Sequence, residues 1–153
     1  MATDDRRELT LTTGEGTLDR VLDLIGEMLS AGRVEEEARL RFELAVAEIG
    51  ANIIEHAGDG DPVTLTLVLE VAPDRLEARF TDDGSPARVD LRAVQMPDVF
   101  AERGRGLAIA LEALDELEYR RRGGENVWRL ACYRDRGGEE PDDDDDEVSG
   151  SVR

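Results

Sequence analysis

The chain has 153 residues, enough for one domain with a buried core, and its formal net charge is -18, from 37 acidic residues against 19 basic ones. All the basic residues are arginine, and so large an acidic excess excludes direct binding to the phosphates of DNA or RNA and favours a basic partner. No apolar run approaches the length of a membrane span and the N-terminus has no apolar signal segment, so we expect a cytoplasmic protein that does not contact a membrane.

Residues 134–153 differ in composition from the rest of the chain. They hold nine acidic residues against three arginines, and five consecutive aspartates follow Pro141. Such a segment repels itself and has little to bury, so we predict one domain over residues 1–133 and a disordered acidic tail over residues 134–153. A solubilising role for this tail is favoured over docking to a specific partner.

Two elements are predicted at the start of the domain. Residues 7–13 alternate polar and apolar side chains, which is typical of an edge strand, and a pair of glycines ends it. Thr17 is placed to cap a following helix, whose apolar residues form one stripe as far as Leu29, before a stop at Ala31-Gly32. The pattern therefore predicts a strand followed by an amphipathic helix.

The next predicted helix runs from near Val34 to His56 and is apolar around most of its circumference. One face comprises Leu40, Leu44, Ala47, Ala51 and Ile54, and Phe42, Ala45, Val46, Ile49 and Ile53 extend it. The remaining polar stripe comprises Arg41, Glu48, Asn52, Glu55 and His56. Because Glu48 and Asn52 are four residues apart on a helix that we expect to be mostly buried, the stripe indicates a ligand-facing surface. Simple solvent exposure is the alternative, and for His56 a structural hydrogen bond is favoured over a ligand contact.

Two strands and a long connection are predicted next. Residues 63–71 and 75–81 are rich in strand-forming residues, and the turn between them indicates an antiparallel hairpin. Asp82-Asp-Gly84 ends the second strand. From Ala87 to Arg103 the sequence is irregular and Pro97 interrupts any helix, which is a pattern often found in lids.

The last predicted elements are a helix from around Gly106, an arginine-rich strand that includes residues 118–122, and a strand over Asn126–Tyr133. Cys132 lies in the apolar run of that last strand, where we expect a packed thiol. Because the strands do not alternate with helices, the order predicts an α/β fold, a two-layer sandwich with helices on one face of a mixed, largely antiparallel sheet.

Three local features together predict a nucleotide site. The carboxylate of Asp82 at a strand end can accept a hydrogen bond from the exocyclic amine of adenine, and Gly84 lets a flat base approach the backbone. Gly104 and Gly106 open a helix whose free amides can bind phosphate. One side-chain oxygen, from Asn52, is enough to help hold Mg²⁺, which keeps phosphates and water as its other ligands. A common turn and an ordinary helix start are the alternatives for the two glycine motifs.

At these residues the chain resembles the GHKL superfamily of ATPases and kinases, and more closely the bacterial anti-sigma factor serine/threonine kinases, over roughly residues 7–133. Glu48-Ile-Gly-Ala-Asn52, with the histidine and alanine that follow shortly after, is similar to the family's N box. Asp82-Asp-Gly84-Ser-Pro is similar to its first glycine box, and Gly104-Arg-Gly106-Leu to its second. The resemblance implies the Bergerat ATP-binding fold.

The resemblance also implies a role for each site residue. Asn52 would coordinate Mg²⁺, Glu48 would activate the attacking nucleophile, and Asp82 would bind the adenine of ATP. The pocket around the nucleotide would be formed by Gly84, Gly104, Gly106 and Leu107, with Arg103 or Arg105 near a terminal phosphate. Many relatives place threonines on the last strand that help to order the adenine-binding aspartate, and here Asn126 can serve as the polar partner instead.

By this resemblance the protein is an anti-sigma factor that sequesters a sigma factor and phosphorylates an antagonist protein on serine or threonine, using ATP and Mg²⁺. The resemblance also suggests a homodimer, formed through the N-terminal edge strand and the first helix, although protection of the strand edge in a monomer is the alternative. The alternative function is a nucleotide-sensing or sequestering module of the same fold that lacks kinase activity.

Overall fold

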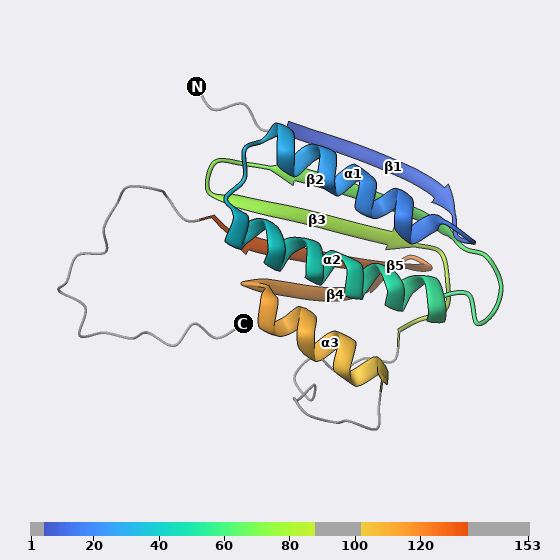
Figure 1. The fold of residues 1–153 in the computed structure, drawn as a ribbon. Helices are drawn as coiled ribbons and strands as arrows, with labels where there is room; N and C mark the ends of the chain where they lie inside the picture. Colours follow the sequence, from blue (N-terminus) through green and yellow to red (C-terminus); the bar gives the residue numbers. More distant parts are fainter. Residues whose placement is uncertain (1–4, 88–101, 135–153) are drawn as a thin grey trace.

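The computed structural model describes residues 5–87 and 102–134, which form two layers (Figure 1). In chain order the elements are β1 (Asp5–Thr12), α1 (Thr17–Ala31), α2 (Glu36–His56), β2 (Thr64–Val71), β3 (Arg75–Asp82), α3 (Glu102–Ala113), β4 (Glu116–Arg122) and β5 (Glu125–Tyr133). The sheet order is β1-β2-β3-β5-β4 and every pairing in it is antiparallel. The predicted α/β sandwich is confirmed, with a sheet that is wholly antiparallel in these residues.

The three helices lie side by side on one face of the sheet, with α2 between α1 and α3 (Figure 1). The core lies between the layers, where Phe42, Val46 and Ile49 of α2 are buried against sheet residues such as Phe80 and Trp128. Alternation along each strand directs these apolar side chains to the helix side. Cys132 is buried there as expected, and burial raises the pKa of its thiol to about 11.

Two details of the helices differ from the prediction. Thr17 does not cap α1, because Gly16 in the left-handed conformation (φ 81°) takes the cap position, and the Thr17 hydroxyl instead accepts a hydrogen bond from the Gly14 amide at 2.8 Å. In α2, Leu40 and Leu44 are 58% and 46% exposed, so the expectation that this face is buried is wrong. The reason is geometric: α2 lies in a single helix layer, and only its sheet side and flanks are covered.

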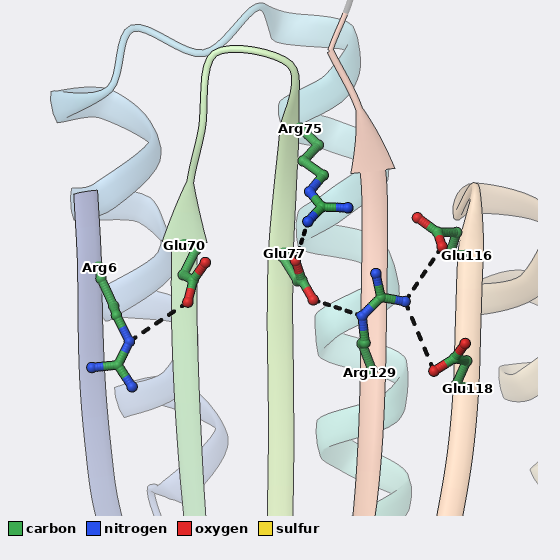
Figure 2. A network of polar contacts seen from close by, with 7 residues as sticks. All are labelled: Arg6, Glu70, Arg75, Glu77, Glu116, Glu118 and Arg129. Carbon is green, nitrogen blue, oxygen red and sulfur yellow. Dashed lines mark hydrogen bonds and ion pairs between the residues drawn. The ribbon is translucent and has the colours of Figure 1, made fainter. Parts of the chain in front are cut away.

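The opposite face of the sheet carries charged side chains and, among the described elements, no helix covers it. Figure 2 shows the ion pairs at one end of this face. Arg129 lies at their centre, 2.6 Å from Glu77 and 3.4 Å from Glu116, while Arg6 pairs separately with Glu70 at 3.5 Å. The side chains of Arg129 and Glu77 are only 20% and 14% exposed, so this pair is better shielded from water than an ordinary surface pair.

Replacing Arg129 by methionine is expected to lower the free energy of unfolding by about 1–2 kcal/mol, because the mostly buried Glu77 loses its closest charged partner and keeps only Arg75, at 3.3 Å. Urea unfolding at low and high salt measures this change. Arg79 is the matched control, since it lies opposite Arg129 on β3, is exposed, and pairs with no acid among the described residues. Arg79→Met should change the stability by less than about 0.5 kcal/mol, and an equal loss in both variants would refute the role given to the pair.

No helix in residues 5–87 and 102–134 is long and apolar enough to cross a membrane. The predicted lid falls almost entirely on residues 88–101, and the predicted disordered tail on residues 135–153, so both lie outside the described residues. The predicted homodimer remains a prediction.

Candidate functional site

The C-terminal half of α2 and the end of β3 bring the sequence-predicted residues together. Asn52 is 9% exposed and Asp82 is 1% exposed, and both side chains line one hollow beside Trp128. Asp82 is the last residue of β3, where the chain turns away from the sheet. The structure therefore brings Asn52 and Asp82 together, as a shared site requires.

Gly84 joins these two elements. A Cβ at this position would lie 2.3 Å from the backbone oxygen of Ala57, just beyond the end of α2, and the Ser85 amide donates to that same oxygen at 2.8 Å. The predicted reason for the glycine was the approach of a flat base. That reason stays a prediction, and the structure adds a packing reason, because the backbone of Ala57 already approaches Gly84 closely.

Gly84→Ala is accordingly expected to destabilise the fold by about 1–3 kcal/mol, since rigid backbone atoms must move to admit the methyl group. Thermal or urea unfolding measures the loss. Gly26→Ala is the matched control, because Gly26 lies inside α1 and a Cβ there meets nothing within 4 Å. That variant should be unchanged or more stable by up to about 1 kcal/mol. A Gly84→Ala protein as stable as wild type would contradict the packing role.

The carboxylate of Asp82 has one satisfied oxygen and one that is free. Oδ1 accepts hydrogen bonds from the Gly84 amide and from Asn126 Nδ2, each at 2.9 Å. Oδ2 is buried and has no hydrogen-bond partner in the described residues. Burial raises the pKa of Asp82, against the lowering effect of the bonds to Asn126 and Gly84. A buried carboxylate oxygen without a donor is costly, and a ligand donor such as an exocyclic amine would satisfy it.

Asn126 holds Asp82 in this orientation. Besides its bond to Asp82, its Nδ2 donates to the Ser85 carbonyl at 2.7 Å, while its Oδ1 accepts from the Tyr119 hydroxyl and from Arg121 at 3.2 Å. The predicted role of Asn126 as a polar partner of Asp82 is confirmed as a direct contact.

Sequence reasoning missed Tyr119 and Arg121. Arg121 also donates to the Gly84 carbonyl at 2.6 Å, and the Tyr119 hydroxyl accepts from the Ala87 amide at 2.9 Å. A signal was available in the hairpin register, because Arg121 lies opposite Asn126 and Tyr119 lies opposite Trp128. The two side chains tie the segment after β3 to the edge strand β4.

A second hollow adjoins the first on the other side of Asn52. It is lined by four residues of the predicted polar stripe and three others: Glu48, Asn52, Glu55 and His56, together with Ala51, Gly106 and Leu107. Asn52 and His56 also line the hollow at Asp82, so the two hollows form one bipartite site. The Asn52 side chain makes no hydrogen bond within the part of the chain that the structure describes. Its amide is therefore available to a ligand. Arg41, the fifth residue of the stripe, pairs with Asp115 at 3.6 Å instead.

Glu48 lies directly beside the second glycine motif. A Cβ on Gly106 would lie 2.7 Å from Glu48 Oε2, so the glycine leaves room for this carboxylate. The helix begins at Glu102 rather than around Gly106, which places Gly104 and Gly106 in its first turns. Leu107 is 4% exposed and lies under the hollow. The side chains of Arg103 and Arg105, like the position of Gly104 relative to a phosphate, lie outside what the structure describes.

The site as a whole has two chemically distinct ends. The Asp82 end offers a buried acceptor beside the aromatic Trp128, which suits the edge of a purine ring. The other end offers the unpaired side-chain amide of Asn52, whose N–H can donate to a phosphate oxygen, and the carboxylate of Glu48, which can accept a proton. Together with three helices on an antiparallel sheet, these ends define a nucleotide-binding domain.

Comparison with known families agrees with this class. The model of the histidine kinase-like ATPase domain matches residues 11–132, and the protein belongs to this family, within the GHKL superfamily. Membership implies that the domain binds ATP. No curated protein matches the chain.

Proposed function

We propose that the protein is a serine/threonine kinase that uses Mg-ATP and acts as an anti-sigma factor, holding a sigma factor and phosphorylating an antagonist protein. The observation that carries the kinase half is the place of Glu48. Its carboxylate lies beside Gly106 and lines the same hollow as Asn52. We call this second hollow the phosphate-side hollow, and a hydroxyl nucleophile would approach there.

The donor set in the described residues fits a magnesium ion held mainly by the nucleotide. These residues contain no cluster of three or more His, Cys, Asp or Glu that could hold a metal. Asn52 offers one neutral side-chain oxygen, and Mg²⁺ bound with ATP takes most of its ligands from phosphates and water. When bound, the ion neutralises oxygen charge on the phosphates.

In the proposed reaction Glu48 accepts the proton of a serine or threonine hydroxyl on the substrate. The hydroxyl oxygen forms a bond to the γ-phosphorus of ATP, the bond from that phosphorus to the β–γ bridging oxygen breaks, and ADP leaves. Asp82 holds the adenine ring, and Asn52 holds the phosphate end of ATP close to Glu48. The protein contributes the in-line placement of the hydroxyl and the γ-phosphate, and it contributes Glu48 as a positioned general base.

The anti-sigma half is supported by charge. The described domain is acidic in its own right, and a basic surface on a sigma factor complements it. Release of one partner and capture of another would follow nucleotide state only if the partner contacts differ between the ATP and ADP forms.

Two measurements test the proposal in order. Calorimetry with Mg-ATP should detect binding by wild type and at least about 10-fold weaker binding by Asn52→Ala, because a buried amide that contacts the ligand is lost. Incubation with Mg-ATP and the antagonist encoded beside it should then yield phosphoserine or phosphothreonine. If Asn52→Ala binds ATP as tightly as wild type does, the proposed nucleotide site is wrong. Tight ATP binding without any transfer would leave the sequestering module as the function.

A further inference from the structure

The outward face of α2 is an apolar stripe that no described element covers. Leu40 and Leu44 are two of the three large apolar side chains that are exposed in residues 5–87 and 102–134. Ala47, Ala51 and Ile54 continue the line with partial exposure, at the helical spacing that keeps all five on one face. The stripe is roughly 20 Å long at about 1.5 Å per residue. Apolar side chains that follow one another along an uncovered helix face, rather than standing singly, are typical of an interaction site.

Acidic side chains border this stripe on both sides. Glu37, Glu48 and Glu55 follow one flank of the helix, and Glu36 and Glu43 lie along the other. The side chains of Glu37 and Glu55 are 86% and 68% exposed. Glu43 pairs with Arg39 at 3.0 Å and Glu37 lies 4.0 Å from Arg41, while Glu36, Glu48 and Glu55 have no arginine partner among the described residues, so the border keeps a negative excess.

A hollow beside the stripe offers a place for an anchoring side chain. It lies between α1 and α2 and is lined by Leu18, Ala51 and Ile54 together with Thr17 and Glu55. An apolar side chain that projects from a partner at the C-terminal end of the stripe would enter this hollow and be shielded from water, which is typical of residues that dominate binding.

The charge pattern identifies the kind of occupant. A second copy of the chain would bring two acidic borders together across the interface, and like charges at such a contact oppose association. An amphipathic helix that carries arginine or lysine beside its apolar stripe would place its leucines on Leu40 and Leu44 and its cations on the acidic borders.

We propose that the outer face of α2 is the docking surface for a basic amphipathic helix of a partner protein. The inference rests on the proposed function only in requiring a protein partner, and it does not depend on phosphoryl transfer. Because Ala51 and Glu55 line both this hollow and the hollow at Glu48 and Asn52, a helix docked here would border the end of the site to which we assign the phosphates.

The test uses a fluorescent four-turn helical peptide with leucines at helical spacing and arginines on both sides of them. Anisotropy titration should detect binding to the wild-type chain that weakens as salt is added. The double substitution Leu40→Ser and Leu44→Ser should weaken binding at least about 10-fold, while Val68→Ser, on the opposite face of the sheet, should leave it unchanged. ATP calorimetry on the double variant should match wild type, which separates loss of docking from loss of the nucleotide site or of the fold.

Several results would overturn the proposal. One is the absence of peptide binding by wild type, and another is equal binding of a peptide with glutamates in place of the arginines or with its leucines scrambled. Undiminished binding by the double variant is a third. If sedimentation instead shows that the double substitution converts a wild-type dimer into a monomer, the occupant is a second copy and the proposed partner is wrong.

Discussion

Asp82→Asn is expected to weaken ATP binding by about 100-fold or more, because the substitution reverses the polarity of the one buried atom that is free for the base. The Gly84 amide and Asn126 both donate to Oδ1, so the new side chain must keep its oxygen there. Its NH₂ group is then left at the Oδ2 position. A donor would face the exocyclic amine of adenine, which is also a donor. Calorimetry with ATP and with GTP measures the effect, and ATP binding within a few-fold of wild type would contradict the adenine role.

The same substitution has an expected signature in stability. Burial raises the pKa of Asp82 above its ordinary value of 3.8, so the folded state binds a proton more readily than the unfolded state. Asp82 therefore contributes stability below pH 3.8 that is lost as pH rises through the raised pKa of the folded state. Asparagine does not titrate. The unfolding free energy of wild type minus that of the variant should therefore fall as pH rises from 3.8 through that window. A difference independent of pH there would contradict the burial of the charge.

Glu48→Gln is expected to lower phosphoryl transfer by about 10²–10⁴-fold and to leave ATP affinity within about 2-fold of wild type. Glutamine keeps the shape of the side chain beside Gly106 but cannot accept the hydroxyl proton. Single-turnover assays with the antagonist protein measure transfer, and calorimetry measures binding.

Glu55→Gln is the matched control for Glu48, since Glu55 is a second carboxylate that lines the same hollow and is 68% exposed. Transfer by that variant should remain close to wild type. If both variants lose transfer equally, the hollow needs negative charge rather than a base at one position. Transfer at the wild-type rate by Glu48→Gln would eliminate Glu48 as the general base.

The sequence was most informative where periodicity and local chemistry agree. The strands and helices, the proximity of Asn52 to Asp82 and the contact between Asn126 and Asp82 all followed from spacing, turn residues and motif resemblance. These features depend on which face of an element a residue occupies, and the sequence records that directly.

The sequence was less informative about what lies next to a face. Periodicity grouped Leu40 with Leu44 but could not say that this face points away from the sheet, because both sides of a helix can be apolar. The packing of Gly84 depends on Ala57, just beyond the end of α2, and the contacts of Tyr119 depend on the segment after β3 lying against β4. Tertiary placement decides each of these.

The network around Asp82 limits where nucleotide discrimination can originate. Its hydrogen bonds to Asn126 and Gly84 orient the Asp82 carboxylate toward the adenine ring, and that ring is identical in ATP and ADP. Whatever free energy this end contributes cancels in the ratio of the two affinities. A partner that distinguishes the two nucleotides must therefore draw its coupling energy from the phosphate end, around Glu48 and Gly106. Substitutions at Asp82 should accordingly weaken both nucleotides together and leave their ratio unchanged.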